Sequence, residues 1–188
     1  MFIQTEATPN PATLKFLPGR VVLPEATFEA KDADAAARSP LASALFAVPG
    51  VSGVYFGHDF ISVTKAEGEN EWPQVKPAVL WAIMEHFQSG APVMAEGAVL
   101  DEGTAEEFYE PADHDTVVTI KDLLETRVRP AVAGDGGDIT FRGYRDGVVY
   151  LEMKGACSGC PSSTATLRQG VQNLFRHFLP DVREVQAI

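Results

Sequence analysis

The chain has 188 residues and a formal net charge of −11, with 45% hydrophobic and 22% charged side chains. These values are typical of a globular protein with one domain or two small ones, and no apolar run reaches the length of a membrane span. Because an acidic chain without a basic stripe binds a phosphate backbone poorly, we predict no nucleic-acid partner and no membrane segment.

The first residues predict a cytoplasmic location. The segment 1–6 lacks the basic and apolar regions of a signal peptide, and it is not an arginine-rich transit sequence. A cytoplasmic protein meets reducing conditions, under which a CxxC pair binds metal or acts in catalysis more often than it forms a structural disulfide.

Residues 1–90 are expected to form a small α+β domain that contains no cysteine. Apolar and β-branched residues bounded by Pro and Gly turns predict strands at 2–6, 13–17, 51–55 and 60–63.

Two helices are expected in the same domain. Ser39-Pro40 is typical of the cap and first position of a helix, which should continue through Phe46. A longer helix is expected from Pro73 to Gly90, with an apolar face that packs in the core. That face consists of Val75, Val79, Ala82, Ile83 and Phe87.

Residues 91–115 are expected to form an acidic linker. The segment contains no lysine or arginine, so its acids should repel one another and keep the chain extended. Its larger apolar side chains, Val99, Leu100, Phe108 and Tyr109, can form a short docked helix. Its acidic residues are Glu96, Asp101, Glu102, Glu106, Glu107, Glu110, Asp113 and Asp115.

Residues 116–188 are expected to fold in the order α-β-β-α-β, as a three-stranded sheet covered by two helices. Apolar residues at helical spacing predict the first helix, which should end near Gly134. Asp146-Gly147 predicts a hairpin between the next two strands. A second amphipathic helix follows the cysteines and is broken at Pro180, and the last strand is expected at 182–188.

The glycine-rich segment 134–138 is interpreted as a helix C-cap and tight turn. It looks superficially like a phosphate-binding loop, but no Lys-Ser/Thr follows it and it leads into a strand. We expect it to pack near the cysteines without supplying ligands, and we expect Asp135 and Asp138 to be turn residues.

The two cysteines of the chain, Cys157 and Cys160, should lie between a strand and a helix. Gly155 and Gly159 let the backbone wrap closely around a ligand, and Pro161 suits the first helical position, which makes Cys160 the expected N-cap. The free N–H groups there should lower the pKa of both thiols. A tetrahedral thiolate site needs four sulfurs, whereas one chain supplies two.

A cysteine pair of this kind is compatible with four roles. The cysteines can be without function, act as a redox dithiol, form part of a zinc site, or form half of an iron–sulfur site shared by two chains. A thioredoxin-like dithiol normally lies in a β-α-β context that is missing here, and His114 and His177 do not show zinc-ligand spacing. Ligand softness and number permit both zinc and iron–sulfur, so the residues alone do not decide between them.

The chain resembles the Nfu-type iron–sulfur cluster carriers in both of its parts. Residues 116–188 look like the NifU C-terminal domain through Arg129-Pro130, the turn 134–139 and the segment Gly155-Ala156-Cys157-Ser158-Gly159-Cys160-Pro161-Ser162-Ser163. Residues 1–90 resemble the accompanying N-terminal domain through 8–11, 14–19, Trp72 and His86-Phe87.

The resemblance implies a carrier and not an enzyme. Cys157 and Cys160 would be the cofactor-binding metal ligands of a 4Fe–4S cluster shared between two subunits, with 2Fe–2S as the other cluster type. It implies a homodimer when the cluster is bound, an upstream assembly scaffold, and apo iron–sulfur client proteins that the N-terminal domain would select. A thiol–disulfide oxidoreductase and a zinc-stabilised interaction module remain the alternatives.

Overall fold

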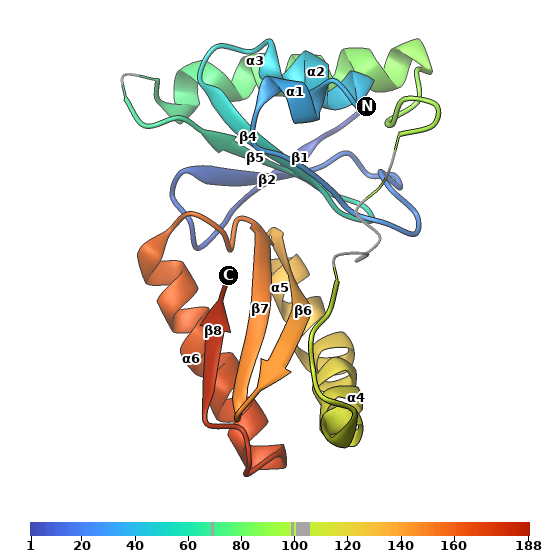
Figure 1. The fold of residues 1–188 in the computed structure, drawn as a ribbon. Coiled ribbons are helices and arrows are strands. Elements are labelled where there is room, and N and C mark those ends of the chain that lie inside the picture. The colour runs from blue at the N-terminus through green and yellow to red at the C-terminus, as the bar shows by residue number, and fades with distance from the viewer. Residues whose placement is uncertain (69, 99, 101–105) are drawn as a thin grey trace. The chain divides into compact units, whose positions relative to one another are not determined.

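The computed structural model describes residues 1–68, 70–98, 100 and 106–188 (Figure 1). It divides into two compact units, Met1–Glu102 and Gly103–Ile188. Each unit combines a sheet with helices, which confirms the predicted α+β class. No helix in the described part of the chain is both long and apolar enough to cross a bilayer.

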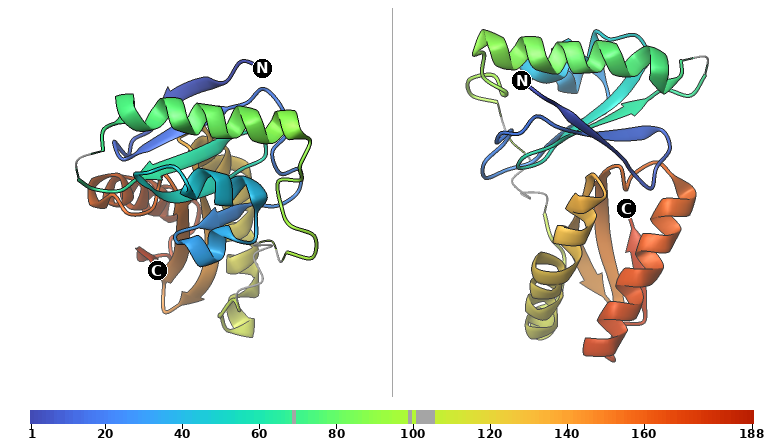
Figure 2. Two further views of the ribbon diagram at one scale, coloured as in Figure 1. Left: turned by 90° about the horizontal axis from the view of Figure 1, so that it is seen from above. Right: turned by 180° about the vertical axis from the view of Figure 1, so that it is seen from behind.

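The N-terminal unit is an antiparallel sheet with its helices on one face (Figures 1 and 2). The spatial order of the five strands is β1-β2-β5-β4-β3. The elements are β1 (Gln4–Ala7), β2 (Thr13–Leu17), β3 (Phe28–Ala30), α1 (Ala33–Ala36), α2 (Pro40–Phe46), β4 (Val51–Phe56), β5 (Ile61–Lys65) and α3 (Trp72–Ser89).

Helix α2 begins and ends where its sequence signals predicted, and α3 ends at the predicted glycine but begins at Trp72, one residue before the predicted start. The Ser39 hydroxyl accepts a hydrogen bond from the Ala42 N–H at 3.0 Å, and Pro40 follows it as the first helical residue. Gly90 ends α3 in the left-handed conformation with φ 73°. The expected apolar face is confirmed in the core, although Phe87 is only half-buried.

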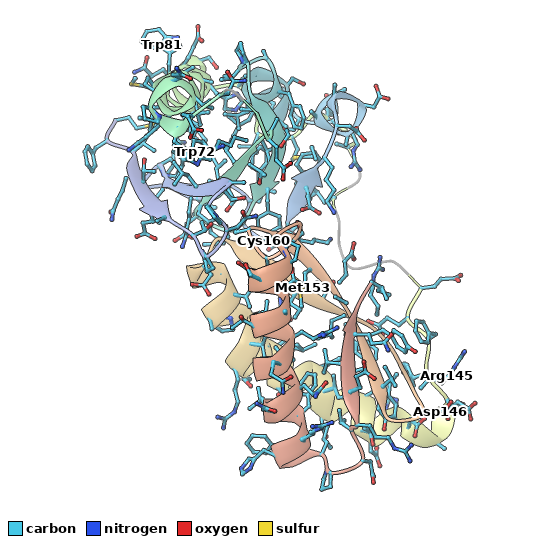
Figure 3. The ribbon with its side chains drawn as sticks, turned by 90° about the vertical axis from the view of Figure 1, so that its left-hand side faces the viewer. Trp72, Trp81, Arg145, Asp146, Met153 and Cys160 are labelled. Carbon is cyan, nitrogen blue, oxygen red and sulfur yellow. The ribbon has the colours of Figure 1, made fainter. Side chains whose placement is uncertain are left out.

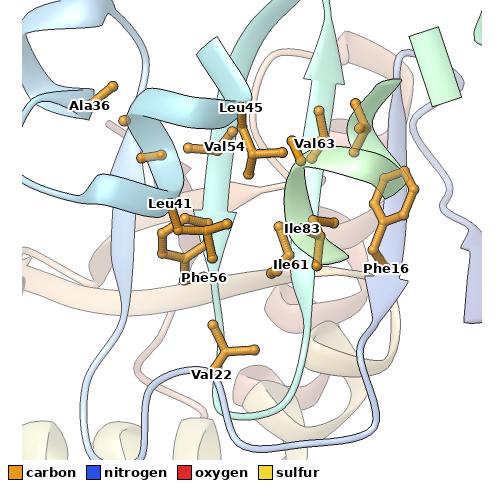
Figure 4. Packing of buried hydrophobic residues seen from close by; sticks show 14 of the residues in the cluster. Phe16, Val22, Ala36, Leu41, Leu45, Val54, Phe56, Ile61, Val63 and Ile83 are labelled. Atoms are coloured by element: carbon orange, nitrogen blue, oxygen red, sulfur yellow. The ribbon is translucent and has the colours of Figure 1, made fainter. Parts of the chain in front are cut away.

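The core of this unit lies between the helices and the sheet (Figure 4). Phe16, Phe56 and Ile61 from the strands are fully buried there, as are Leu41 and Leu45 of α2. Burying side chains of this size contributes about 1.5–3 kcal/mol each, so this packing is a large stabilising contribution.

The C-terminal unit has the predicted α-β-β-α-β order. Strands β6 (Gly137–Arg145) and β7 (Val148–Gly155) are antiparallel, and β8 (Glu184–Ala187) pairs with β7 in parallel. Two helical arms cover one face of the sheet (Figure 2). The second arm is α6 (Pro161–Phe178).

The first arm is continuous but not uniform. It consists of α4 (His114–Leu123), a π-helical turn η2 (Leu124–Val128) and α5 (Arg129–Gly134). Pro130 lacks an N–H and its ring would crowd the carbonyl of residue 126 in a regular α-helix. The wider turn before it lets the chain stay helical through the proline.

The linker predicted at 91–115 falls partly on Val99 and 101–105, which lie outside the described residues. The described residues on either side pack against the nearer unit. Val93, Met94 and Leu100 contact the N-terminal core. Phe108 is extended rather than helical: its N–H donates to the Arg142 carbonyl at 3.1 Å, and its carbonyl accepts from the Tyr144 N–H at 2.9 Å.

Candidate functional site

The two cysteines lie on the loop that joins β7 to α6, and Figure 3 shows Cys160 where this loop enters the helix. Gly155 and Gly159 adopt left-handed φ values of 64° and 80°, which favour glycine and let the loop turn sharply. Cys160 is the N-cap of α6 and Pro161 is its first residue, so both predicted positions are confirmed.

The two thiols occupy different environments. The Cys157 side chain lies in the C-terminal core, where the residue is 6% exposed, whereas Cys160 is partly exposed at the helix start. The Thr164 hydroxyl donates to the Cys157 carbonyl at 2.9 Å and fixes the loop to the first turn of α6. One thiol is therefore held inside the fold and the other faces the surroundings.

The pKa values of the two thiols move in opposite directions. Burial, reinforced by the negative charges of Asp135 and Asp138, raises the pKa of Cys157 to about 12. Hydrogen bonds with Ser162, at a sulfur–oxygen distance of 3.4 Å, and with Ser163 lower the pKa of Cys160 to about 7. The prediction that both pKa values fall is wrong for Cys157, because that residue precedes the helix and is enclosed by the core.

Alkylation of the cluster-free protein should report this difference. Because only the thiolate reacts, the rate at Cys160 should rise with pH and reach half its maximum near pH 7, while Cys157 stays unmodified. Replacing Ser162 with alanine removes a hydrogen bond to the thiolate and should move this midpoint to higher pH. Peptide mass spectrometry after timed iodoacetamide labelling measures both, and labelling of Cys157 ahead of Cys160 would contradict the assignment.

The glycine-rich turn packs directly against the Cys157 loop. The Gly136 carbonyl accepts a hydrogen bond from the Ala156 N–H at 3.1 Å. At Gly137, a side chain would place its Cβ 2.7 Å from the Cys157 sulfur and 2.6 Å from the Lys154 carbonyl oxygen. As expected, the turn packs near the cysteines, and it requires glycine at 137 because no space remains beside the sulfur.

Asp138 is not a turn residue, contrary to the prediction. It lies in β6 with its side chain 6% exposed and forms two hydrogen bonds with the Arg129 guanidinium, at 2.9 and 3.0 Å. Arg129 also pairs with Glu125, and these contacts raise the pKa of Arg129. The Arg129–Asp138 pair therefore joins α5, in the first helical arm, to β6, the strand whose Gly137 lies against Cys157.

The described residues of one chain assemble too few donors for a closed metal site. No cluster of three or more His, Cys, Asp or Glu side chains occurs among the residues the structure describes. His114 lies near the Tyr109 hydroxyl and His177 packs edge-on against Phe178, so neither completes a zinc site with the cysteines. Within the described ranges, the two thiols can supply two of the four donors that a tetrahedral thiolate site needs.

The family comparisons match both units of the chain. A model described as scaffold protein Nfu/NifU N terminal matches residues 3–90, and a NifU-like domain matches residues 120–186. A human protein named NFU1 iron-sulfur cluster scaffold homolog, mitochondrial, is 45% identical over the whole chain, which covers 72% of that protein. The chain belongs to the Nfu family.

Further Nfu relatives agree. The protein of the same name from Drosophila sechellia is 49% identical over the whole chain, which spans 65% of its length. The NMR structure of a NifU-like protein from Saccharomyces cerevisiae is 26% identical and superimposes with a TM-score of 0.43, covering 51% of this chain and 86% of that one.

The cytoplasmic location predicted from the sequence is contradicted by these Nfu relatives, whose names describe them as mitochondrial. The prediction depended on the first residues of the chain. Because the relatives extend beyond the part that this chain matches, those residues carry no information about the compartment.

Proposed function

We propose that this Nfu-family protein carries a 4Fe–4S cluster between two chains and passes it to apo iron–sulfur proteins. The observation that supports this most is the pair of adjacent thiols, Cys157 and Cys160, without a third donor in the described residues. A second chain related by a twofold axis supplies two more thiols at the same place. The cluster is then cargo, and no substrate bond is broken.

The two thiols differ in burial and in pKa, and this difference suits the loading and release of a cluster. Cys160 is accessible and is partly thiolate at neutral pH, so it can be displaced by an incoming thiol. Cys157 must lose its proton to bind iron, and the surrounding core keeps its sulfur in position. We propose that Cys160 is exchanged first and that Cys157 holds the cluster longest.

The remaining parts are assigned on the same basis. Residues 116–188 bind the cluster, the cysteine-free domain 1–90 recognises clients, and the acidic stretch 91–115 joins them. A linked client site raises the effective concentration of client near the cluster. An upstream scaffold would provide the cluster, and 2Fe–2S is the alternative cargo.

A redox dithiol is less consistent with the site. Such enzymes attack with an exposed first cysteine of low pKa. Here the first cysteine, Cys157, is the buried one with the raised pKa.

Anaerobic reconstitution with iron and sulfide tests the proposal. A shared 4Fe–4S cluster should give broad visible absorption, about two iron atoms per chain and a dimer by native mass spectrometry. Cys160→Ser should lose the iron while keeping the fold. Cys157→Ala is a less specific test, because the Cys157 sulfur lies in the core and its loss should also cost about 1 kcal/mol of stability.

The outcomes separate the candidates. Zinc without colour would indicate an interaction module, and disulfide reduction without iron would indicate a dithiol enzyme. A full cluster on an isolated single chain would contradict sharing. Transfer is tested by mixing the loaded protein with an aconitase-type apo-enzyme, whose activity should return.

A further inference from the structure

A surface groove of about 390 Å³ lies directly beside Cys160. One side of the groove is formed by a face of α6, and the opposite side is formed by the end of β8. Most of the lining is small or apolar, so a charged group there has a strong influence on what can bind. The lining residues are Gly159, Cys160, Pro161, Thr164, Ala165, Arg168 and Ala187.

Arg168 is the one charged side chain among the described residues that line the groove. Its Cα lies about 12 Å along the helix from that of Cys160, and long helical side chains lean toward the helix N-terminus. Arg168 and Cys160 line the same groove, and this general tendency favours a guanidinium that lies on the Cys160 side of its own Cα.

Arg168 also differs from two other arginines of the C-terminal unit. Arg129 and Arg142 are paired with carboxylates of the same unit, whereas Arg168 is exposed and has no hydrogen bond or ion pair within the described ranges. An exposed arginine without an ion pair adds little to folding. Its positive charge is available to a ligand in the groove.

We propose that Arg168 is a positioning residue that holds negatively charged sulfur against Cys160. This inference rests on the proposed carrier function. Two sources present the same chemistry: the cluster, which is an anion with four thiolate ligands, and the thiolate of the protein that receives it. In either case Arg168 increases the local concentration of the anion at the exposed cysteine.

The effect of the Arg168 charge on Cys160 can be measured without a cluster, by comparing the rates of two alkylating reagents with the full-length apo protein. Iodoacetate is an anion and iodoacetamide is neutral, yet both react with the Cys160 thiolate, so the ratio of their rates does not depend on the thiolate fraction. Arg168→Gln should lower the iodoacetate-to-iodoacetamide ratio about two- to fivefold at low ionic strength. Arg168→Glu should lower it further, and Arg168→Lys should preserve it.

Gln169→Glu is the matched control. Gln169 is next to Arg168 but pairs with Asn173 and does not line the groove, so the added charge should change the ratio much less. Each variant should keep its melting temperature, since both side chains are exposed. A ratio that does not change in Arg168→Gln, or changes equally in Gln169→Glu, overturns the inference whether or not the protein binds a cluster.

Loaded protein distinguishes the two sources. Faster removal of iron from Arg168→Gln by a chelator assigns the charge to the cluster. Slower transfer to an apo acceptor with unchanged chelator removal assigns it to the incoming thiolate. If neither rate changes, Arg168 has no role in holding the anion.

Discussion

Replacing Arg129 with methionine is expected to lower the free energy of unfolding of the C-terminal unit by about 2–3 kcal/mol. The change leaves the Asp138 carboxylate buried without its two hydrogen bonds from the guanidinium. Loss of one partner from a fully buried pair costs about 3–5 kcal/mol. The value is reduced here because Arg129 is 34% exposed and Lys154 lies opposite Asp138 in the strand register.

Arg142→Met is the matched control for this experiment. Arg142 pairs with Glu152 on the same sheet at 2.9 Å, but both side chains are about a quarter exposed, so its loss should cost about 1 kcal/mol or less. Urea unfolding followed by circular dichroism and amide hydrogen exchange measures both variants. Trp72 and Trp81 both lie in the N-terminal unit, so tryptophan fluorescence provides an internal reference that should not move. Equal losses of unfolding free energy in the two variants would contradict the proposal that the Arg129–Asp138 pair stabilises the unit more than an exposed ion pair does.

Elements with local signals were predictable from the sequence. Ser39-Pro40, Gly90 and Cys160-Pro161 set helix ends through their own backbone chemistry, and the structure has those ends. Strand β3 and helix α1 were missed because they are 3 and 4 residues long. The strand is defined by its pairing with β4, and no periodicity can develop over so short a stretch.

The features of the site that the sequence did not predict depend on contacts between distant elements. The spacing of Cys157 and Cys160 predicted a ligand pair, but not that one thiol is enclosed by the core. The Arg129–Asp138 pair joins a helix to a strand, and Arg129 was noted only as part of a motif. The contact of Gly137 with a sulfur twenty residues later likewise follows from the β6–β7 pairing, in which Gly137 lies opposite Gly155. The available sequence signal was an acid, Asp138, directly after two glycines. This pattern is typical of a turn, and the sequence does not show that the acid is buried.

Gly137→Ala is expected to reduce bound iron from about two atoms per chain to near zero. The added Cβ would lie 2.6 Å from the Lys154 carbonyl oxygen and 2.7 Å from the Cys157 sulfur, both inside contact distance. The carbonyl belongs to β7, so it cannot withdraw without opening the end of the β6–β7 pair. The Cys157 loop must therefore move, and overpacking of this kind destabilises a fold by about 1–3 kcal/mol.

The control for this substitution is Gly134→Ala, three residues earlier. A Cβ at Gly134 meets no atom within 4 Å, and the residue ends α5, so alanine should preserve iron binding and leave stability unchanged or raise it by up to about 1 kcal/mol. A second measurement keeps the test informative if Gly137→Ala binds no iron because it is partly unfolded. In the apo protein, a displaced loop should expose Cys157 to iodoacetamide while tryptophan fluorescence still reports a folded N-terminal unit. If Cys157 stays protected and iron binding is normal in Gly137→Ala, then the glycine does not position the thiol and the buried cysteine is held by the core alone.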